Sequence, residues 1–399
     1  MMRIEGHAPA KLNLTLEVLG RRADGYHEVA SIMHTLSLCD TLTLELPSPE
    51  RLNPALGEIH IVEASDTNRA AKVRECTGLE SPRTPTLSPL DKGGEGREWG
   101  DSTRAEVSGL WLCDRYDSLP LREAIPTDSR NLVWQAVARF WEMLNLPPSL
   151  GFPPLREGNR TQGQVPPLRE GNQPPSVPPA SRGNLTEGVQ ASWHATLLKR
   201  IPSQAGLGGG SSDAACALCL LNQWAAQYAR ALPDDALYAL ACELGTDVAF
   251  FLNGGCALAT GKGERLQPLP TLPPFWWVLA KPYEVGVPTG WAYAQLGRGA
   301  VSPNARADHT ERLARLLPTI RTPRDLAPLL HNDFDAPILQ AIPALAELRT
   351  LLEQGGALRV ILCGSGAAQA ALCESEAHAK TLADTLLRQN YWAVPAQSS

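Results

Sequence analysis

A run of glycines between two apolar segments constrains the fold of this chain more than any other feature. It extends from Gly206 to Gly210 and is followed by Ser211 and Ser212. Glycine loses more conformational entropy on folding than any other residue, so such a run is costly unless something must approach the backbone closely. Apolar residues recur at helical spacing from about Ser212 to Ala231. We therefore predict a loop, approached by a ligand, that leads into a helix.

The place of this loop directly before a helix predicts an anion site. The first N–H groups of a helix lack internal partners and carry about half a positive charge. Glycines let a phosphate approach these groups without a Cβ in the way, and the two serine hydroxyls add donors and a helix cap. No lysine follows the glycines, which excludes a Walker A loop, and their spacing departs from the dinucleotide fingerprint. A turn that only permits tight packing remains the alternative.

Composition and charge exclude several other classes of function. The 399 residues are 43% hydrophobic and 20% charged, which is ordinary for a soluble globular protein with room for two domains. The net charge of −6 gives no bulk attraction to nucleic acid or to an anionic membrane. The N-terminal segment has no uninterrupted apolar stretch of the signal-peptide type, and no segment reaches the roughly 18 apolar residues of a membrane span.

The nine cysteines are scattered along the chain, with one C-x-x-C inside the predicted helix after the glycines. There is no second C-x-x-C and no histidine pair at metal-ligand spacing. We predict a reduced, cytoplasmic protein and name no metal-ligating residue.

The organisation of the chain predicts two domains of an α+β fold with low-complexity insertions. Residues from about 47 to 108 and from 147 to 188 are rich in proline, glycine and charge, and the heptapeptide PPLREGN occurs twice in the second segment. Such composition buries too little apolar surface to offset the entropy of ordering, so we predict that both are disordered. The predicted domains are residues 1–272, which contain both insertions, and residues 273–399.

Periodicity places the regular elements. Period-two alternation predicts strands over residues 12–18 and 41–46, joined through an Asp-Gly turn, and a strand over 195–201 that leads into the glycines. The remaining predicted elements are helices over 131–140 and 235–244 and around 307–317, 343–353 and 374–388, with strands over 276–281 and 359–362.

Three segments resemble the three motifs of the GHMP kinases, in the same order. Residues 202–215, PSQAGLGGGSSDAA, resemble the loop that wraps the ATP phosphates in that family. Residues 8–14 resemble the first motif, and residues 363–367 resemble the third, a glycine-rich loop of the second domain. The resemblance implies an N-terminal ribosomal-protein-S5-domain-2-like domain, a C-terminal ferredoxin-like α+β domain and an ATP site in the cleft between them. The implied ATP-binding residues are Pro202, Gly206, Leu207, Gly208, Gly209, Gly210, Ser211 and Ser212.

Further segments resemble the branch of this family that phosphorylates the C2 hydroxyl of a cytidine-diphosphate-linked methylerythritol in the non-mevalonate route to isoprenoids. They include PAKLNL at 9–14, RADGYH at 22–27 and GTDVAFF at 245–251. The resemblance covers roughly residues 3–46, 125–146 and 190–395 and omits the two insertions. It implies ATP with Mg²⁺ as phosphate donor, a small-molecule substrate, and neither nucleic acid nor membrane as a partner.

The resemblance also implies a catalytic pair. Asp247 is the implied general base, and Lys11 lies beside it, where an ammonium keeps the carboxylate ionised and polarises the attacking hydroxyl. Asn13 shares the strand face of Lys11 and is placed in the substrate site. From the residues alone, Asp247 suits equally well as the N-cap of the apolar helix that follows, and Lys11 suits a solvent-facing strand position.

Three other residues are implied contacts for the substrate. His27 stacks on the cytosine, Tyr26 adjoins it in the same turn, and Thr289 reaches the diphosphate. Three alternatives remain open: a GHMP kinase for mevalonate, homoserine or a sugar, an S5-like binding protein without catalysis, and an inactive enzyme whose insertions block the cleft. The Asp-Gly-Tyr-His segment disfavours the first, because a small alcohol needs no stacking partner, and the acidic composition disfavours RNA binding.

Overall fold

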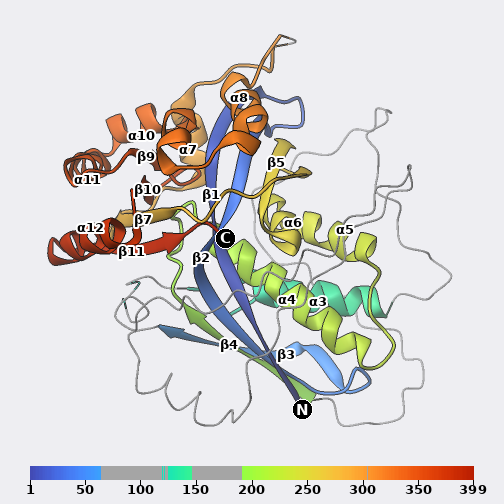
Figure 1. The fold of residues 1–399 in the computed structure, drawn as a ribbon. Helices are drawn as coiled ribbons and strands as arrows, with labels where there is room; N and C mark the ends of the chain where they lie inside the picture. The colour runs from blue at the N-terminus through green and yellow to red at the C-terminus, as the bar shows by residue number, and fades with distance from the viewer. Residues whose placement is uncertain (64–118, 120, 122–124, 146–190, 303) are drawn as a thin grey trace.

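The structure of the protein is a computed structural model that describes residues 1–63, 119, 121, 125–145, 191–302 and 304–399. In these ranges the chain forms two β-sheets with helices packed against them (Figure 1). The C-terminal elements lie to one side of the long β1–β2 ribbon, and α3, α4, α5 and α6 lie to the other. Elements from both halves of the chain therefore flank the β1–β2 ribbon.

The first sheet has the order β3-β4-β2-β1-β8, with β5 paired to β2 and β6 paired to β5. Its two longest strands, β1 and β2, form an antiparallel ribbon across the molecule. The strands are β1 (Met2–Arg21), β2 (His27–Leu46), β3 (Leu52–Glu63), β4 (Ala191–Lys199), β5 (Cys256–Gly261), β6 (Arg265–Leu269) and β8 (His331–Asn332).

An irregularity in the β1–β2 ribbon positions the first motif. The pairing register shifts between Pro9 and Lys11. Proline has no N–H to give to a sheet, and such shifts re-aim the side chains that follow. The N–H of Lys11 instead donates to the carbonyl of Leu207 at 2.9 Å. The first motif is thus joined directly to the glycine loop.

Strand β3 shows that the prediction for the first insertion was wrong over Leu52–Glu63. The segment pairs in parallel with β4, Ile59 is buried, and the Trp193 ring lies against Gly57, where a Cβ would come within 2.0 Å of it. The sequence contains a short alternating run there, GEIHIVE, but the proline and glycine around it made the whole segment resemble a disordered insertion. Residues 64–118 and 146–190, which hold nearly all the rest of both predicted insertions, lie outside the described residues.

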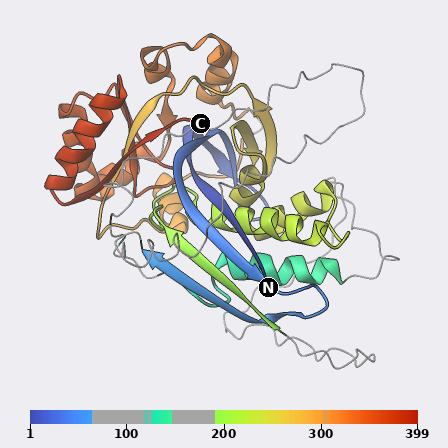
Figure 2. The same cartoon turned by 60° about the horizontal axis from the view of Figure 1, so that its bottom comes forward.

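Four helices cover one face of this sheet, and the apolar side chains between the helices and the sheet form a hydrophobic core (Figure 2). Trp193, Trp224 and Phe140 are among the largest side chains buried there. Helix α3 begins after Asn131, whose side chain caps it by accepting from the N–H of Val133 at 2.9 Å. The helices are α3 (Leu132–Leu144), α4 (Gly209–Ala226), α5 (Asp234–Leu244) and α6 (Thr246–Asn253).

The second sheet has the order β11-β7-β10-β9. Its buried residues form one core with Leu12 and Leu14 of β1. The strands are β7 (Trp276–Pro282), β9 (Arg359–Leu362), β10 (Gln369–Leu372) and β11 (Tyr391–Gln397). The helices are α7 (Thr289–Leu296), α8 (Asp308–Leu316), α9 (Pro323–Leu326), α10 (Asp335–Ala341), α11 (Pro343–Gln354) and α12 (Glu376–Arg388), with short 3₁₀ turns at Leu317–Thr319 and Ala327–Leu329. Helices α11 and α12 pack against the second sheet, whereas α8 packs against β1 and β2 of the first sheet.

The predicted strands and helices of this half all exist, with ends shifted by a few residues at most. Strand β9 coincides with its prediction, because a run of apolar β-formers is bounded there by clear turn residues. Within the described ranges, none of the helices has the length and apolarity needed to span a bilayer.

A buried histidine predicts a loss of stability in acid. The Nε2 of His34 accepts from the N–H of Leu272 at 3.2 Å, while its Nδ1 contacts the carbonyl of Thr35 at 2.8 Å, so the neutral ring with hydrogen on Nδ1 fits both contacts. Burial lowers the pKa of His34, although the contact with Thr35 opposes this. The unfolded chain therefore binds the proton more tightly. Stability is retained above pH about 6.5 and is lost as pH falls from there through the folded pKa.

We expect the free energy of unfolding to fall by up to about 1.4 kcal/mol per pH unit from this group below pH about 6.5. Urea unfolding between pH 8 and 5.5 measures the slope. Burial lowers the pKa of His7 and His27 in the same direction, so His34→Gln should flatten the slope without abolishing it. An unchanged slope in that variant would assign the acid sensitivity to other groups.

Candidate active site

Lys11 and Asp247 lie side by side although they come from different elements. The Nζ of Lys11, on β1, is 3.7 Å from Oδ2 of Asp247. The Lys11 side chain is 6% exposed and that of Asp247 is 35% exposed, so the pair has one buried and one accessible member. The N-cap of α6 is Gly245, and Asp247 is the second residue of the helix. The N-cap alternative for Asp247 is therefore wrong, and its carboxylate is left available for chemistry.

A chain of hydrogen bonds fixes the ammonium of Lys11. Its Nζ donates to Oδ1 of Asn13 at 2.6 Å, and the amide of Asn13 donates to Oγ of Ser31 at 2.7 Å. The hydroxyl of Ser31 then donates to the carbonyl of Thr15 at 2.6 Å. Asn13 is buried, so the structure gives it the role of holding Lys11; its contact with a substrate stays a prediction.

Two glycines of the loop are required by the packing of the chain itself. A Cβ on Gly206 would lie 1.7 Å from the carbonyl oxygen of Cys363, and one on Gly208 would lie 2.9 Å from the Phe251 ring. Both glycines also have positive φ, of 76° and 74°. The packing alternative therefore holds for these two residues. Gly210 differs, because it is exposed and a Cβ there would meet only Leu132 at 3.9 Å.

The third motif lies against the glycine loop. The N–H of Ala367 donates to the carbonyl of Gln204 at 3.0 Å, and the N–H of Ala368 donates to that of Ala205 at 3.1 Å. The amide of Asn332 holds this segment by donating to the carbonyls of Leu362 and Gly364 at 2.9 and 2.8 Å. The three motifs thus meet at one place.

The N-terminus of α4 suits an anion. The helix begins at Gly209 rather than at Ser212, because the positive φ of Gly208 places that residue at the N-cap. The serines are therefore not the cap, contrary to our prediction. The first turn contains no acidic residue, so its N–H groups keep their positive field. Ser211 is half-buried, whereas Pro202, Leu207 and Ser212 are buried and shape the loop from within.

Two of the predicted substrate residues, His27 and Thr289, lie at α7. The ring of His27 stacks on Tyr293, with centroids 4.5 Å apart and planes 25° apart, and Tyr293 meets Phe334 edge-on. Burial, and then the negative charge of Asp247, raises the pKa of Tyr293 to about 12. Thr289 is exposed one helical turn before Tyr293, on the same side of α7.

Tyr26 lies further out than His27. Its side chain is 57% exposed, and the ammonium of Lys262 lies 4.8 Å from its ring centroid. An open hollow adjoins this turn and is lined in part by Arg21, Arg22 and Asp24, whereas neither Lys11 nor Asp247 lines it. Burial, and then the charge of Arg21, lowers the pKa of His27, which favours a neutral ring near pH 7.

Comparison with known proteins agrees with this geometry. Residues 182–255 match the GHMP kinases N terminal domain, and residues 313–391 match the GHMP kinases C terminal domain. The chain is 30% identical over 390 residues to the 4-diphosphocytidyl-2-C-methyl-D-erythritol kinase of Gloeobacter violaceus, covering 97% of this chain and 91% of that protein. It belongs to the 4-diphosphocytidyl-2-C-methyl-D-erythritol kinase family.

Other relatives support this membership. The family member of Synechocystis is 29% identical over 384 residues, covering 94% of this chain and 88% of that protein. A crystal structure of 4-(cytidine 5'-diphospho)-2C-methyl-D-erythritol kinase matches with a TM-score of 0.57 and 27% identity over 99% of this chain and 100% of that one. A homoserine kinase from Cytophaga hutchinsonii shares the fold alone, at 14% identity and a TM-score of 0.54 over 100% of this chain and 94% of that one. The predicted family, α+β class and GHMP kinase architecture are confirmed.

In this kinase the strand before the glycine loop is tied to α4 by a buried ionic cluster that the sequence analysis missed. Lys199 contacts Asp40 and donates to Oδ2 of Asp213 at 2.8 Å, and all three side chains are buried. Burial opposes the charge on Lys199, but the two carboxylates raise its pKa. Burial also raises the pKa of Asp213, and the charge of Asp40 acts in the same direction. The cluster ties the last residue of β4 to β2 and to the N-terminal part of α4.

The burial of Asp213 bears on which side chains near the loop could contact a magnesium ion bound with ATP. Of the two nearby side chains that could make such a contact, Asp213 and Ser211, Asp213 is buried against Lys199 and is not presented to the loop surface. Ser211, the other, is half-buried in the first turn of α4. Magnesium prefers oxygen ligands and usually keeps several waters, so one hydroxyl beside phosphate oxygens fits its chemistry.

Proposed function

We propose that this kinase transfers the γ-phosphoryl group of ATP to the C2 hydroxyl of 4-diphosphocytidyl-2-C-methyl-D-erythritol. The observation that carries the proposal is the Lys11–Asp247 pair, joined through the backbone of Lys11 to the glycine loop at the start of α4. Lys11 of β1 therefore contacts both the proposed phosphate-binding loop and the proposed base. The names of the relatives supply the substrate, and the His27–Tyr293 stack suits its pyrimidine.

The ATP phosphates would lie at the N-terminus of α4. The N–H groups of the first turn point to that side, and the exposed Gly210 leaves their approach open. Mg²⁺ would be held chiefly by the phosphates and water, with the Ser211 hydroxyl as a protein ligand, and would neutralise charge on the phosphate oxygens. Transfer passes through a loose transition state, so positioning contributes about 7–11 kcal/mol of the barrier reduction.

Asp247 accepts the proton of the C2 hydroxyl as that oxygen attacks the γ-phosphorus. A positioned base of this kind contributes about 10²–10⁴-fold to the rate. Lys11, held by Asn13, keeps its ammonium 3.7 Å from the carboxylate and donates toward the attacking oxygen. The new phosphorus–oxygen bond forms as the bond to the β-phosphate oxygen breaks, and ADP leaves from the loop.

The cytosine would stack on His27. One face of the imidazole is taken by Tyr293, so the other is the face for the base. Thr289, on the same side of α7 as Tyr293, would meet the diphosphate. Tyr26 would border the same region from the turn before β2.

Replacing His27 with alanine should raise the KM for the cytidine substrate by about 5- to 150-fold, because stacking of one base contributes about 1–3 kcal/mol. The KM for ATP should change far less. Steady-state kinetics with each substrate varied in turn measures the two constants. His27→Phe keeps a ring and should recover most of the affinity. An equal rise in both KM values would count against stacking.

The proposed function is tested by ATP consumption with Mg²⁺ in the presence of the cytidine-diphosphate methylerythritol, mevalonate, homoserine or galactose. We expect turnover with the cytidine compound alone. Turnover with another of these alcohols would keep the kinase and reject the substrate. Bound ATP without turnover on any of them would favour an inactive enzyme.

A further inference from the structure

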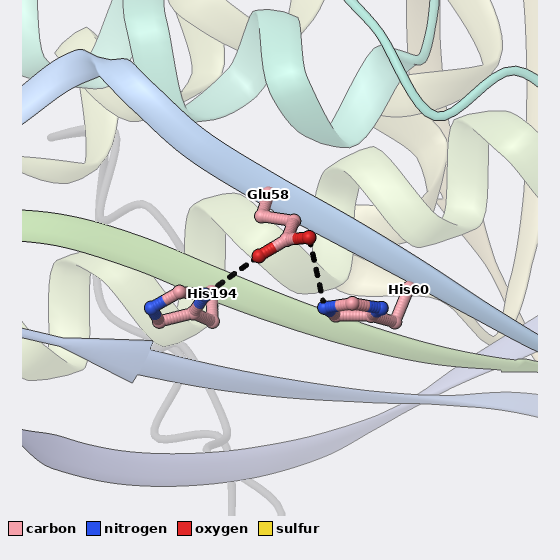
Figure 3. Close-up of side chains that lie close together, drawn as sticks. All are labelled: Glu58, His60 and His194. Atoms are coloured by element: carbon pink, nitrogen blue, oxygen red, sulfur yellow. Dashed lines mark ion pairs between the residues drawn. The ribbon is translucent and has the colours of Figure 1, made fainter.

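A second cluster of ligating side chains stands on the first sheet and plays no part in the proposed phosphoryl transfer. Glu58 and His60 lie two residues apart on β3 and therefore share a face, and the parallel register places His194 of β4 directly opposite Glu58. Ile59, which lies between Glu58 and His60, and Trp193, which precedes His194, are buried in the core beneath α3 and α4. The cluster therefore lies on the opposite face of the sheet, and its three side chains converge there (Figure 3).

We propose that Glu58, His60 and His194 bind a Zn²⁺ ion. Oε1 of Glu58 is 3.4 Å from Nε2 of His60, and Oε2 of Glu58 is 3.5 Å from Nδ1 of His194. All the ligand atoms lie within 4.8 Å of one another. Bonds of about 2.0–2.2 Å to a tetrahedral zinc put neighbouring ligands roughly 3.3 Å apart, so small side-chain rotations bring all three into range.

The remaining nitrogen of His194 has the partner that a zinc ligand needs. Its Nε2 lies 3.2 Å from Oγ of Ser192, which can accept a hydrogen bond when Nε2 carries the hydrogen. In that tautomer Nδ1, the atom facing Glu58, is unprotonated and can bind a metal. Ligating histidines almost always donate from their other nitrogen in this way, which fixes the ring and makes it a better ligand.

The donor set selects the kind of ion. Two imidazoles and one carboxylate suit zinc and its transition-metal neighbours, whereas Mg²⁺ and Ca²⁺ prefer oxygen alone. Glu45 of β2 is paired with His194 from the other side and adds negative charge near the site. The side chains of Glu58 and His60 are more than half exposed, so water can complete the coordination.

Such an ion would join strands that are far apart in sequence. Strand β3 is at one end of the strand order and β4 is its neighbour there. A ligand that binds only where β3 and β4 are paired stabilises that pairing by mass action. The inference is independent of the proposed kinase reaction, because none of the three ligands belongs to the catalytic pair or the glycine loop.

Isothermal titration of the chelator-treated, nucleotide-free full chain with ZnCl₂ tests the proposal. We expect one zinc ion with micromolar affinity and no comparable binding of MgCl₂. His60→Ala and His194→Ala should each weaken this binding by more than about tenfold, and Ser192→Ala should weaken it by about tenfold. His378→Ala, which removes a half-buried histidine from α12, is the matched control and should bind as the wild type does.

Cobalt gives a second readout, because Co²⁺ bound by these ligands absorbs visible light and His194→Ala should lose that spectrum. Circular dichroism establishes that each variant is folded, and Glu58→Gln tests the site with a side chain of the same shape. Wild-type protein that binds zinc no more tightly than millimolar would overturn the proposal. Micromolar binding that survives both histidine variants would overturn it equally, by assigning the ion to other residues such as the cysteines.

Discussion

Replacing Asp247 with asparagine should lower turnover by about 10²–10⁴-fold, the contribution of a positioned general base, while ATP binds almost as before. The amide has nearly the shape of the carboxylate but cannot take the proton of the attacking hydroxyl. The substitution also removes the negative charge that lies 3.7 Å from the ammonium of Lys11. Rapid-quench measurement of a single turnover, together with titration of ATP, separates the chemical step from binding.

Asp235 offers a matched control for this variant. Both aspartates are the second residue of a helix, Asp235 in α5 and Asp247 in α6, and both favour the helix N-terminus by their charge. Asp235→Asn should therefore reproduce the loss of about 0.3–1 kcal/mol of helix stabilisation with little effect on turnover. If Asp247→Asn stays within tenfold of the wild-type rate, Asp247 is not the base.

The sequence predicted the catalytic segments well because each carries local information. Alternation in β1 placed Lys11 on a strand, the apolar run after Asp247 indicated a helix, and the glycines marked the start of α4. The resemblance then suggested that these segments meet, and the structure brings Lys11 and Asp247 within 3.7 Å. Their catalytic roles stay predictions.

Features that depend on tertiary contact could not be predicted in this way. The partners of Lys199 come from β2 and α4, and nothing local in their sequence indicates that one buried ammonium joins them. Tyr293 was overlooked because a half-buried aromatic residue on a short helix is ordinary core material until it is seen against His27. The ligands of the proposed zinc site lie on β3 and β4, which are separated in the sequence by residues 64–190. No rule of ligand spacing along the sequence therefore groups them.

Local rules also misplaced two boundaries for physical reasons. Gly208 ends the loop because only its positive φ turns the chain into α4, so the next two glycines fall inside a helix despite their low propensity. Strand β3 forms because Ile59 and the paired β4 give it a core to face, which outweighs the proline and glycine around it.

Two alanine substitutions in the glycine loop should have opposite effects on stability. Gly206→Ala places a Cβ 1.7 Å from the Cys363 carbonyl oxygen at a φ of 76°, so either the loop or the third motif must move. We expect a loss of about 2–5 kcal/mol in the free energy of unfolding, from overpacking and left-handed strain together, and weak binding of ATP. Gly210→Ala removes a glycine from a helix and should raise stability by up to about 1 kcal/mol.

The same Gly210→Ala variant should still bind ATP less well, because its new methyl group meets only Leu132 at 3.9 Å and otherwise stands in the space proposed for the phosphates. Urea unfolding and ATP titration of both variants give the four values needed. A Gly206→Ala protein as stable as the wild type would contradict the contact with Cys363. Unaltered ATP affinity in Gly210→Ala would mean that the phosphates do not pass over this residue. We expect Gly206→Ala to lower both stability and ATP affinity, and Gly210→Ala to lower ATP affinity alone. The pair therefore distinguishes a glycine needed for packing from a glycine needed for the ligand.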